Sequence, residues 1–425
     1  MLKKIFAGTE LFKNISTLVT GTLLAQLVPI LLQTILRRTY PAEDFGAFAV
    51  FLSVTSILMV AASFRYEMSI VLPDKRSDSV NIVFAATFAS LLFNLLLLAA
   101  VWIFSDSFLV FLNLGQEYRF VLFWIPASTF LFSSYQIMNY YLVRYKRYRS
   151  ISINKISRRI SEGAGQTAAG FAGYYSTGLI IGNILGHLVN NLSGIIQLMK
   201  SDFSLRLFSW RRQREVMLRY RDFPMYNMIP ALLNAICMHL PLILVNKFYN
   251  QETAAYFDLS RQVLVLPASI LALSISQVML QNISEKRRKR ESFVGDLKKI
   301  LLLLSIPAAG MFVIFSIWAP TLFRLYAGAE YSTSGEIARI LVAGAALKLI
   351  VSPVSSIFAA IGKIKVVSLW HTFYFLLISS LFLFKDLDIF SFLYLYLGID
   401  LLAYSILLSL IFYVSRSYEK KLINS

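Results

Sequence analysis

The chain has 425 residues, of which 57% are hydrophobic and only 15% are charged, whereas an average soluble domain has about 25% charged residues. This composition excludes an ordinary water-soluble domain and is typical of a protein surrounded by lipid. The single cysteine, Cys237, excludes an internal disulfide and a cysteine-rich metal site. The net charge of +18 does not indicate a nucleic-acid partner, because the basic residues lie between apolar runs rather than on one folded basic surface.

Twelve apolar runs of about 20 residues are long enough to cross a bilayer core of about 30 Å as α-helices. In chain order, the predicted spans are 14–36, 45–64, 80–104, 119–140, 156–172, 178–199, 224–246, 254–279, 300–320, 336–360, 364–384 and 389–414. The fifth span is the least apolar, because it contains two arginines and a glutamate.

The basic residues are distributed unevenly between the two sides of this arrangement. Most of the 41 lysines and arginines lie in loops that share a side with both termini, and few lie in the loops on the other side. Short cytoplasmic loops carry an excess of lysine and arginine. We therefore expect both termini to be cytoplasmic.

The longest basic loop, 200–222, reads KSDFSLRLFSWRRQREVMLRYRD and mixes apolar side chains with arginines. This pattern is typical of an amphipathic surface helix, here linking two halves of the chain. The halves resemble each other weakly: when EDFGAFAVFLSVTSIL at 43–58 is laid over ETAAYFDLSRQVLVLP at 252–267, Glu43 meets Glu252. A parallel repeat of six helices is a transporter pattern, with the substrate site between the halves.

We therefore predict an all-α polytopic membrane protein with twelve transmembrane helices in two six-helix bundles around a central cavity. The predicted segments are an N-terminal six-helix lobe at 1–205, a cytoplasmic amphipathic linker at 206–222 and a C-terminal six-helix lobe at 223–425.

The sequence carries no signature of an enzyme. It has no phosphate-binding GxxxxGK[ST] loop, although AAIGKIK contains the Gly-Lys pair. The three histidines, His187, His239 and His371, fall in three different spans without the spacing of metal ligands. We expect no metal site, no cofactor and no catalytic residues.

Two stretches carry a resemblance to a known family. LFKNISTLVTGTLLAQLVPILLQTILRRTYPAEDFGAF at 11–48 and RYEMSIVLP at 65–73, together with twelve spans and cytoplasmic ends, resemble the bacterial polysaccharide-unit flippases. These belong to the multidrug/oligosaccharidyl-lipid/polysaccharide exporter superfamily.

The resemblance implies a flippase of the cell inner membrane that moves undecaprenyl-diphosphate-linked oligosaccharide units. Such units serve surface polysaccharide biosynthesis, as in the O-antigen of lipopolysaccharide. It further implies lipid-linked oligosaccharide, membrane lipids and a polysaccharide polymerase as partners, and coupling to protons or sodium.

Arg65 and Glu67 stand at the predicted cytoplasmic end of the second span. Because they are two residues apart, they do not share a helical face if the helix continues. They either anchor the helix end at the membrane interface or act as gate charges that pair with the opposite half. The resemblance favours the gate without deciding between the two.

Span 5 carries Arg158, Arg159 and Glu162, and ionisable groups within a span are costly unless they face a cavity or a partner. Arg158 and Glu162 are four residues apart and share a helical face. They either form an intrahelical pair or line the cytoplasmic mouth of the cavity, with Arg159 unpaired. In span 6, His187 and Asn190 belong to a polar stripe that either binds sugar hydroxyls or joins helices.

The second half carries its own ionisable residues. Lys348 lies near the middle of span 10 with no acid within one turn of its helix, which makes it the first candidate for lining the cavity. In span 8, Asp258 and Arg261 are three residues apart and form either an ion pair or part of a polar face. Arg339 either reaches the interface or lines the cavity, and Asp400 serves either proton coupling or an interhelical pair.

These candidates include more bases than acids, so the cavity should attract an anion such as a diphosphate. The substrate-binding candidates are Lys348, Arg159, Arg158, Arg261, Arg339, His187 and Asn190, and the candidates for ion coupling or a gate are Asp258, Glu162, Asp400, Arg65 and Glu67.

Two other functions remain open at this point. An exporter of drugs or small cations from the same superfamily would need acidic groups, whereas span 1 has Gln26 and Gln33 but no carboxylate. A membrane polysaccharide polymerase or glycosyltransferase would need a large periplasmic loop for its chemistry. The longest predicted connections on that side, about 105–118 and 321–335, are short.

Overall fold

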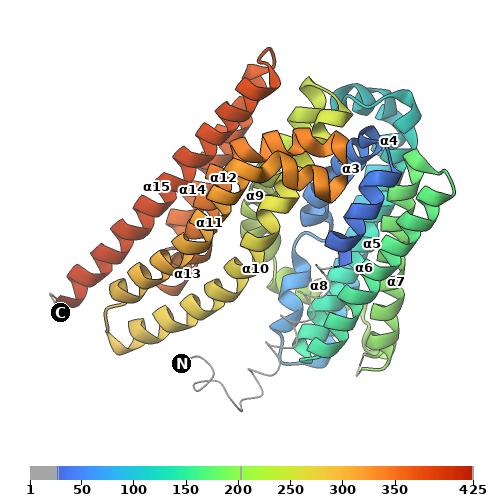
Figure 1. Ribbon diagram of the computed structural model, residues 1–425. Coiled ribbons are helices and arrows are strands. Elements are labelled where there is room, and N and C mark those ends of the chain that lie inside the picture. The colour runs from blue at the N-terminus through green and yellow to red at the C-terminus, as the bar shows by residue number, and fades with distance from the viewer. Residues whose placement is uncertain (1–25, 27, 202, 424–425) are drawn as a thin grey trace. The chain divides into compact units, whose positions relative to one another are not determined.

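The computed structural model describes residues 26, 28–201 and 203–423 of the chain (Figure 1). Within this part of the chain, every regular element is a helix. The first predicted span, 14–36, lies mostly outside the described residues, and its described part belongs to a helix that continues to residue 39.

The helices follow one another through short connections. In chain order they are α3 (Ala42–Ala62), α4 (Arg76–Leu112), α5 (Arg119–Arg144), α6 (Tyr148–Phe171), α7 (Tyr175–Met199), α8 (Trp210–Arg219), α9 (Met228–Phe248), α10 (Gln251–Lys289), α11 (Val294–Ala327), α12 (Ser332–Val351), α13 (Ile357–Ala360), α14 (Ile364–Ser380) and α15 (Ile389–Ile423). Among the described residues, nine helical stretches are long and apolar enough to cross a membrane. The helical residues 28–39, α6 and α10 occupy the other three predicted span positions.

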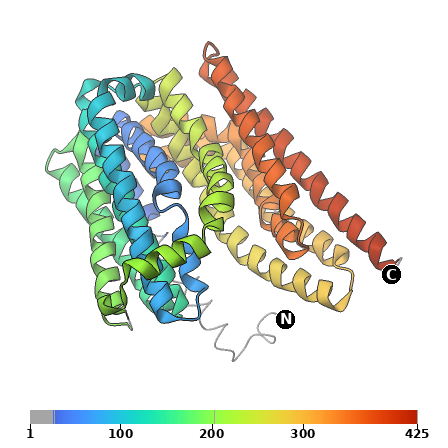
Figure 2. The same cartoon turned by 180° about the vertical axis from the view of Figure 1, so that it is seen from behind.

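The chain divides into two compact units. Unit 1 ends at His239 and also includes Asn250–Glu252, while unit 2 comprises Leu240–Tyr249 and the chain from Thr253 onward. The predicted linker, 206–222, contains α8, which belongs to unit 1 and packs on α4. Figure 2 shows α8, in green, lying across the blue helix α4.

Several helices end where the backbone cannot continue a regular helix. α3 ends at Ala62, just before Phe64 and Arg65, whose φ angles of 51° and 62° lie in the left-handed region. α12 ends at Val351, because Pro353 has no backbone N–H to donate to the preceding helical turn.

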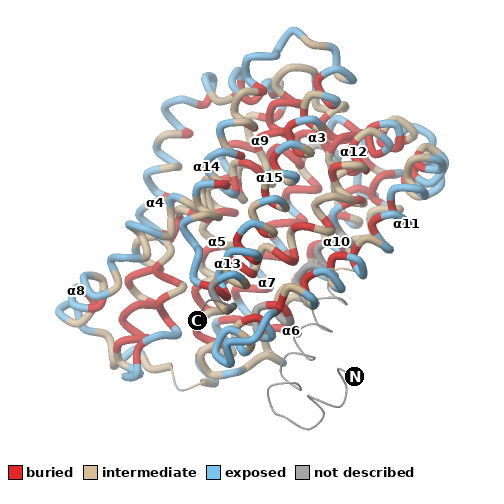
Figure 3. The backbone as a smooth tube through the Cα atoms, turned by 90° about the vertical axis from the view of Figure 1, so that its left-hand side faces the viewer, coloured by how far each residue is buried: buried red, intermediate tan, exposed pale blue. Residues whose placement is uncertain are grey.

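Large apolar side chains cover the outer faces of both units. On α4 the exposed positions include Leu91, Leu92, Leu95 and Leu96, and on α11 they include Leu302, Leu303 and Ile306. Figure 3 shows exposed positions along both helices. In water such extended apolar surfaces would be unfavourable, whereas a bilayer core solvates them. The chain is therefore a multi-pass membrane protein.

Within unit 1, α7 carries a row of glycines at every fourth position, Gly178, Gly182 and Gly186, and this row faces α6. A Cβ added at Gly182 would lie 2.6 Å from the backbone nitrogen of Gln166, and one at Gly186 would lie 2.7 Å from the Cβ of Glu162. Small residues let two helix backbones approach closely. The glycine row therefore brings α7 against α6, the least apolar of the long helices in unit 1.

In unit 2, α12 packs on α11 and α15. A Cβ added at Gly335 would lie 2.7 Å from the carbonyl carbon of Ala319 on α11. A Cβ at Gly344 would lie 3.5 Å from the Cβ of Asp400 on α15. Glycines thus let α12 approach both neighbours closely, and one of these approaches places α12 beside the buried carboxylate of Asp400.

The glycine row gives a direct test of this packing. We expect Gly182→Ala to destabilise the protein by about 1–3 kcal/mol, because the added methyl group must push α6 away from α7. Gly310→Ala on α11 is the matched control, since its Cβ would meet no atom within 4 Å. Thermal unfolding of the purified full-length variants measures both effects, and equal midpoints for the two variants would contradict the close α6–α7 packing.

Candidate functional site

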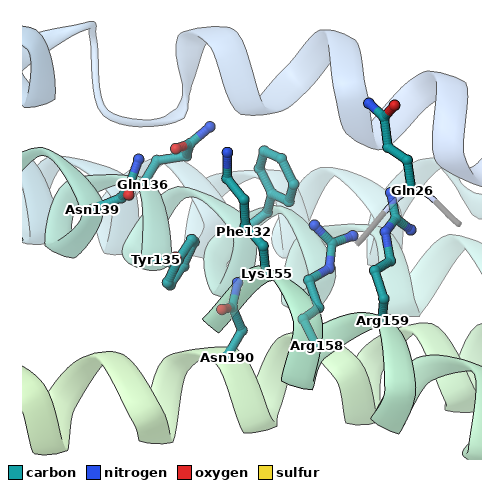
Figure 4. Close-up of a pocket in the computed structure, with 9 residues that line it drawn as sticks. All are labelled: Gln26, Phe132, Tyr135, Gln136, Asn139, Lys155, Arg158, Arg159 and Asn190. Atoms are coloured by element: carbon teal, nitrogen blue, oxygen red, sulfur yellow. The ribbon is translucent and has the colours of Figure 1, made fainter. Parts of the chain in front are cut away.

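A pocket of about 240 Å³ lies within unit 1, among α5, α6 and α7 (Figure 4). Its lining residues are Gln26, Phe132, Tyr135, Gln136, Asn139, Lys155, Arg158, Arg159 and Asn190. Three of these side chains are cations, four are carboxamides and two are aromatic, and none of the nine is acidic. The pocket therefore offers positive charge and hydrogen-bonding groups to a ligand.

Two helices supply most of the lining through the same spacing. On α5, the lining residues 132, 135, 136 and 139 follow the i, i+3, i+4, i+7 pattern that defines one helical face. On α6, Lys155, Arg158 and Arg159 follow the first three positions of that pattern, and Glu162 takes the fourth. Figure 4 shows the three cations side by side on α6. Helical periodicity alone thus collects the cations on one side of the pocket.

The carboxylate of Glu162 holds the two arginines in place. Its Oε2 lies 3.0 Å from Nη1 of Arg159 and 3.8 Å from Nε of Arg158, and its Oε1 accepts a hydrogen bond of 2.6 Å from Asn183 on α7. The prediction that Arg159 is unpaired is therefore wrong. Residues three and four positions before Glu162 both lie on its face of the helix, so the carboxylate reaches both guanidinium groups.

The pocket also contains acceptor atoms without partners. The Oδ1 atoms of Asn139 and Asn190 are buried and have no hydrogen-bond partner among the described residues. Leaving a buried acceptor unsatisfied costs about 1–3 kcal/mol, so a ligand that donates a hydroxyl proton there would relieve that cost. His187 lies outside the pocket lining, is 2% exposed, and packs edge-on against Phe132 with ring centroids 5.1 Å apart. Its role in binding stays a prediction.

Sequence reasoning missed six of the nine lining residues, among them Lys155 and Tyr135. Lys155 belongs to the basic run from Arg144 to Arg159, and the sequence assigned it to the cytoplasmic loop just before the predicted fifth span. Tyr135 shares its helical face with Asn139, one turn away on α5. The repeated i, i+3, i+4 spacing on two consecutive helices was the signal that could have identified both.

The arrangement suits an anion with oxygen atoms that accept several hydrogen bonds. Guanidinium groups bind phosphate oxygens through paired, charge-assisted hydrogen bonds, and an ammonium adds a compact charge. Glu162 offsets only part of this charge, because it is one carboxylate beside three cations. The carboxamides and Tyr135 extend the site with groups that can bind hydroxyls.

In unit 2, the structure pairs two predicted residues with each other. Lys348 Nζ lies 2.5 Å from Asp400 Oδ2, and the hydroxyl of Tyr374 donates a hydrogen bond of 2.7 Å to the other oxygen of Asp400. The ammonium also lies 5.6 and 5.3 Å from the ring centroids of Tyr396 and Tyr404, within reach of cation–π attraction. Asp400 therefore forms the interhelical pair that was one of its two predicted roles.

Arg65 and Glu67 also form a contact that the sequence argued against. Arg65 Nη1 lies 3.5 Å from Glu67 Oε1, and the hydroxyl of Ser63 donates a hydrogen bond of 2.5 Å to Glu67 Oε2. The expectation that the two charges point apart assumed a continuing helix. α3 instead ends at Ala62, and the left-handed backbone at Phe64 and Arg65 turns the chain so that Arg65 contacts Glu67. Whether they act as a gate stays a prediction.

The remaining predicted residues make contacts within their own unit. Asp258 accepts a hydrogen bond of 2.7 Å from Gln262, one turn along α10. The guanidinium of Arg261 lies 5.5 Å from the ring centroid of Phe257 on the same helix. Arg339 donates a hydrogen bond of 3.2 Å to the carbonyl oxygen of residue 317 on α11. None of the three lines the pocket in unit 1.

The chain was compared with protein families, with curated protein sequences and with solved structures. The sequence matches the family model described as "Polysaccharide biosynthesis protein" over residues 35–336. No curated protein sequence matches the chain.

Solved structures of low sequence identity share the fold. The lipid II flippase MurJ in an inward closed conformation is 13% identical, with 96% of this chain and 91% of that chain covered and a TM-score of 0.76. An inward-facing multidrug resistance transporter of the MATE family, in the MOP superfamily, is 13% identical, with 96% of each chain covered and a TM-score of 0.71. A MOP superfamily transporter from Pyrococcus furiosus, described by the reversed polarity of its binding pocket, is 14% identical over 96% of this chain and 95% of that chain, with a TM-score of 0.64. The predicted fold class, an all-α membrane protein with twelve spans in two bundles, is confirmed.

The Lys348–Asp400 pair predicts unequal effects of removing its two partners. Lys348→Ala leaves the 6% exposed carboxylate of Asp400 without its cation, and we expect a loss of about 3 kcal/mol in the free energy of unfolding. Asp400→Asn should cost less, because the carboxamide oxygen can still accept a hydrogen bond from the Lys348 ammonium. Combining Lys348→Ala with Asp400→Ala should recover part of the loss. Thermal unfolding of the purified proteins measures this, and strictly additive effects would contradict the pairing.

Proposed function

Because the chain belongs to the polysaccharide biosynthesis protein family, we propose that it is a flippase for lipid-linked oligosaccharides. Its substrate is an undecaprenyl-diphosphate-linked oligosaccharide unit, which it moves across the cell inner membrane by alternating access. The product serves surface polysaccharide biosynthesis, such as O-antigen assembly, and is passed to a polysaccharide polymerase. The fold shared with a lipid II flippase supports a lipid-linked substrate.

The observation that carries this proposal is the cationic pocket of unit 1. A diphosphate presents several anionic oxygens close together, and Lys155, Arg158 and Arg159 present their cationic groups from one helical face. The partnerless amide oxygens of Asn139 and Asn190 can accept hydrogen bonds from sugar hydroxyls attached to that diphosphate. Charge and hydrogen-bonding capacity therefore match the two polar parts of the proposed substrate.

The size of the pocket indicates that the polar head of the substrate enters it and that the polyprenyl tail stays outside. Pockets that enclose drug-sized ligands measure about 300–1,000 Å³, and this pocket has about 240 Å³. It can hold a diphosphate and adjoining groups, but it cannot enclose a polyprenyl chain as well. In this mechanism the polyprenyl tail stays in lipid, along apolar outer surfaces like those of α4 and α11, while the polar head enters the protein.

The alternative of a cation exporter has less support. A pocket lined by three cations and no acid repels a positively charged drug. Glu162, which lies outside the lining, contacts the lining residues Arg158 and Arg159 and accepts a hydrogen bond from Asn183.

The same contacts weigh against a polymerase or glycosyltransferase. An enzyme of that kind needs a group that takes a proton from the attacking hydroxyl, and Glu162 is committed to two cations. We propose that the chain is a transporter and not an enzyme. Within it, the roles predicted for Arg261, Arg339, Asp258, Arg65 and Glu67 stay predictions, whereas Lys348 and Asp400 form the ion pair described above.

Removing one pocket arginine tests the proposed function. We expect Arg159→Ala to weaken binding of farnesyl diphosphate, a short polyprenyl diphosphate, by about tenfold to a hundredfold, because a charge-assisted hydrogen bond contributes about 1.5–3 kcal/mol. Arg159→Lys should retain part of the affinity. Titration of the purified full-length protein measures the affinities.

The matched control is Lys385→Ala, which removes an exposed cation far along the chain from the pocket, beside α14. It should leave binding unchanged. Equal affinity for farnesyl diphosphate in the native protein and in Arg159→Ala, or equal binding of the uncharged alcohol farnesol, would contradict the proposal.

The orientation of the chain is a further part of the proposal, with both termini in the cytoplasm. Reporter fusions at residues 208, 288 and 422 should then report the cytoplasm, and fusions at 110, 250 and 328 the periplasm. Residue 288 lies within the most basic run of the chain, so a periplasmic signal there would contradict the orientation.

A further inference from the structure

The short helix α8 is fixed firmly to one end of α4. Arg212 and Arg219 of α8 both contact the buried carboxylate of Asp78, at 2.6 and 3.1 Å. The hydrogen bond to Asp78 raises the pKa of Arg212 above its ordinary value, so this contact keeps its charge. Asn81 of α4 adds two hydrogen bonds of 2.9 Å to the chain just before α8, to the N–H of Ser209 and the carbonyl oxygen of residue 207. The helix is therefore a fixed platform.

The opposite face of this platform is cationic and exposed. Val216 and Gln213 face α4 and are buried, whereas the side chain of Arg211 is 92% exposed. Arg214 on the same helix and Arg206 just before it are also exposed. Arg211 contacts Glu215 at 3.3 Å, but an ion pair this exposed contributes little and leaves the guanidinium accessible. We call Arg206, Arg211 and Arg214 the α8 arginines.

Trp210, at the first position of α8, fixes the level of this platform relative to the lipid-facing surface. Its ring is 69% exposed and packs edge-on against Phe88 of α4, with centroids 6.4 Å apart. Phe88 is itself exposed and begins the apolar outer face of α4 that continues through Leu91 and Leu95. Tryptophan favours the boundary between hydrocarbon and headgroups. The α8 arginines therefore start at the edge of the lipid-facing surface.

We propose that the α8 surface binds the headgroups of anionic phospholipids. Guanidinium groups pair with phosphate oxygens, and an anionic headgroup adds a net charge that a zwitterionic one lacks. Asp78 uses the two arginines that face the protein, which leaves the three α8 arginines for lipid. Exposed Leu218, on the same helix, adds apolar contact with the upper part of the acyl chains. This site lies outside the pocket and does not depend on the proposed function.

Trp210 provides a local probe of the bound lipid. The full-length protein is reconstituted in phosphatidylcholine vesicles that contain an equal small fraction of brominated phosphatidylglycerol or brominated phosphatidylcholine. The fluorescence difference between the native protein and Trp210→Phe isolates the signal of Trp210 from the other four tryptophans. We expect brominated phosphatidylglycerol to quench Trp210 more strongly than brominated phosphatidylcholine, and 1 M salt to reduce the difference.

Neutralising the α8 arginines must remove this preference. The triple variant Arg206→Gln, Arg211→Gln and Arg214→Gln should lose roughly three- to fivefold in relative affinity for phosphatidylglycerol per arginine. The matched control is Arg288→Gln with Arg290→Gln, which removes two exposed arginines from unit 2 and should keep the preference.

Equal quenching of the native protein by the two brominated lipids would overturn the proposal and leave the α8 arginines to an acidic protein partner. A preference that survives in the triple variant would overturn it as well.

Discussion

The close approach of α6 and α7 is the constraint on which the pocket depends. α6 carries two arginines, a lysine and a glutamate along one face, and such a helix is costly in lipid unless neighbouring helices cover it. Gly182 and Gly186 remove the side chains that would hold α7 away, so the backbone of α7 lies against Gln166 and Glu162. The same contact brings Asn183 to the carboxylate of Glu162. The close packing of α7 on α6 therefore also places a hydrogen-bond donor on the Glu162 carboxylate.

The two units treat their buried charges differently. In unit 2, Lys348 and Asp400 neutralise each other, and the hydroxyl of Tyr374 satisfies the second carboxylate oxygen. In unit 1, Glu162 serves two arginines and leaves the pocket cationic. Breaking a buried pair is expensive, so the first arrangement favours stability, while an excess of cations can be satisfied by an anionic ligand. We therefore place substrate binding in the pocket of unit 1.

Hydropathy predicted the helices well, because the length and apolar composition of a membrane span are properties of the local sequence. Contacts between residues far apart in the sequence could not be predicted from local hydropathy. Lys348 has no acid in its own helix, and its partner Asp400 comes from another helix 52 residues later. The Arg65–Glu67 contact depends on a left-handed backbone at Phe64 and Arg65. The sequence does not predict this conformation, because neither residue is a glycine or an asparagine. Arg159 was misjudged for a simpler reason: a carboxylate can reach residues both three and four positions away.

A transport assay in vesicles separates a flippase of lipid-linked oligosaccharide from an exporter of cations. Purified full-length protein is reconstituted in vesicles that contain undecaprenyl-diphosphate-linked oligosaccharide, and a lectin outside the vesicles reports the sugar on the outer leaflet over time. The proposed function predicts protein-dependent exposure of sugar from the inner leaflet, which should fall strongly when Arg158 and Arg159 are both replaced by alanine. Protein-dependent movement of a lipophilic cation, with none of the oligosaccharide lipid, would contradict it.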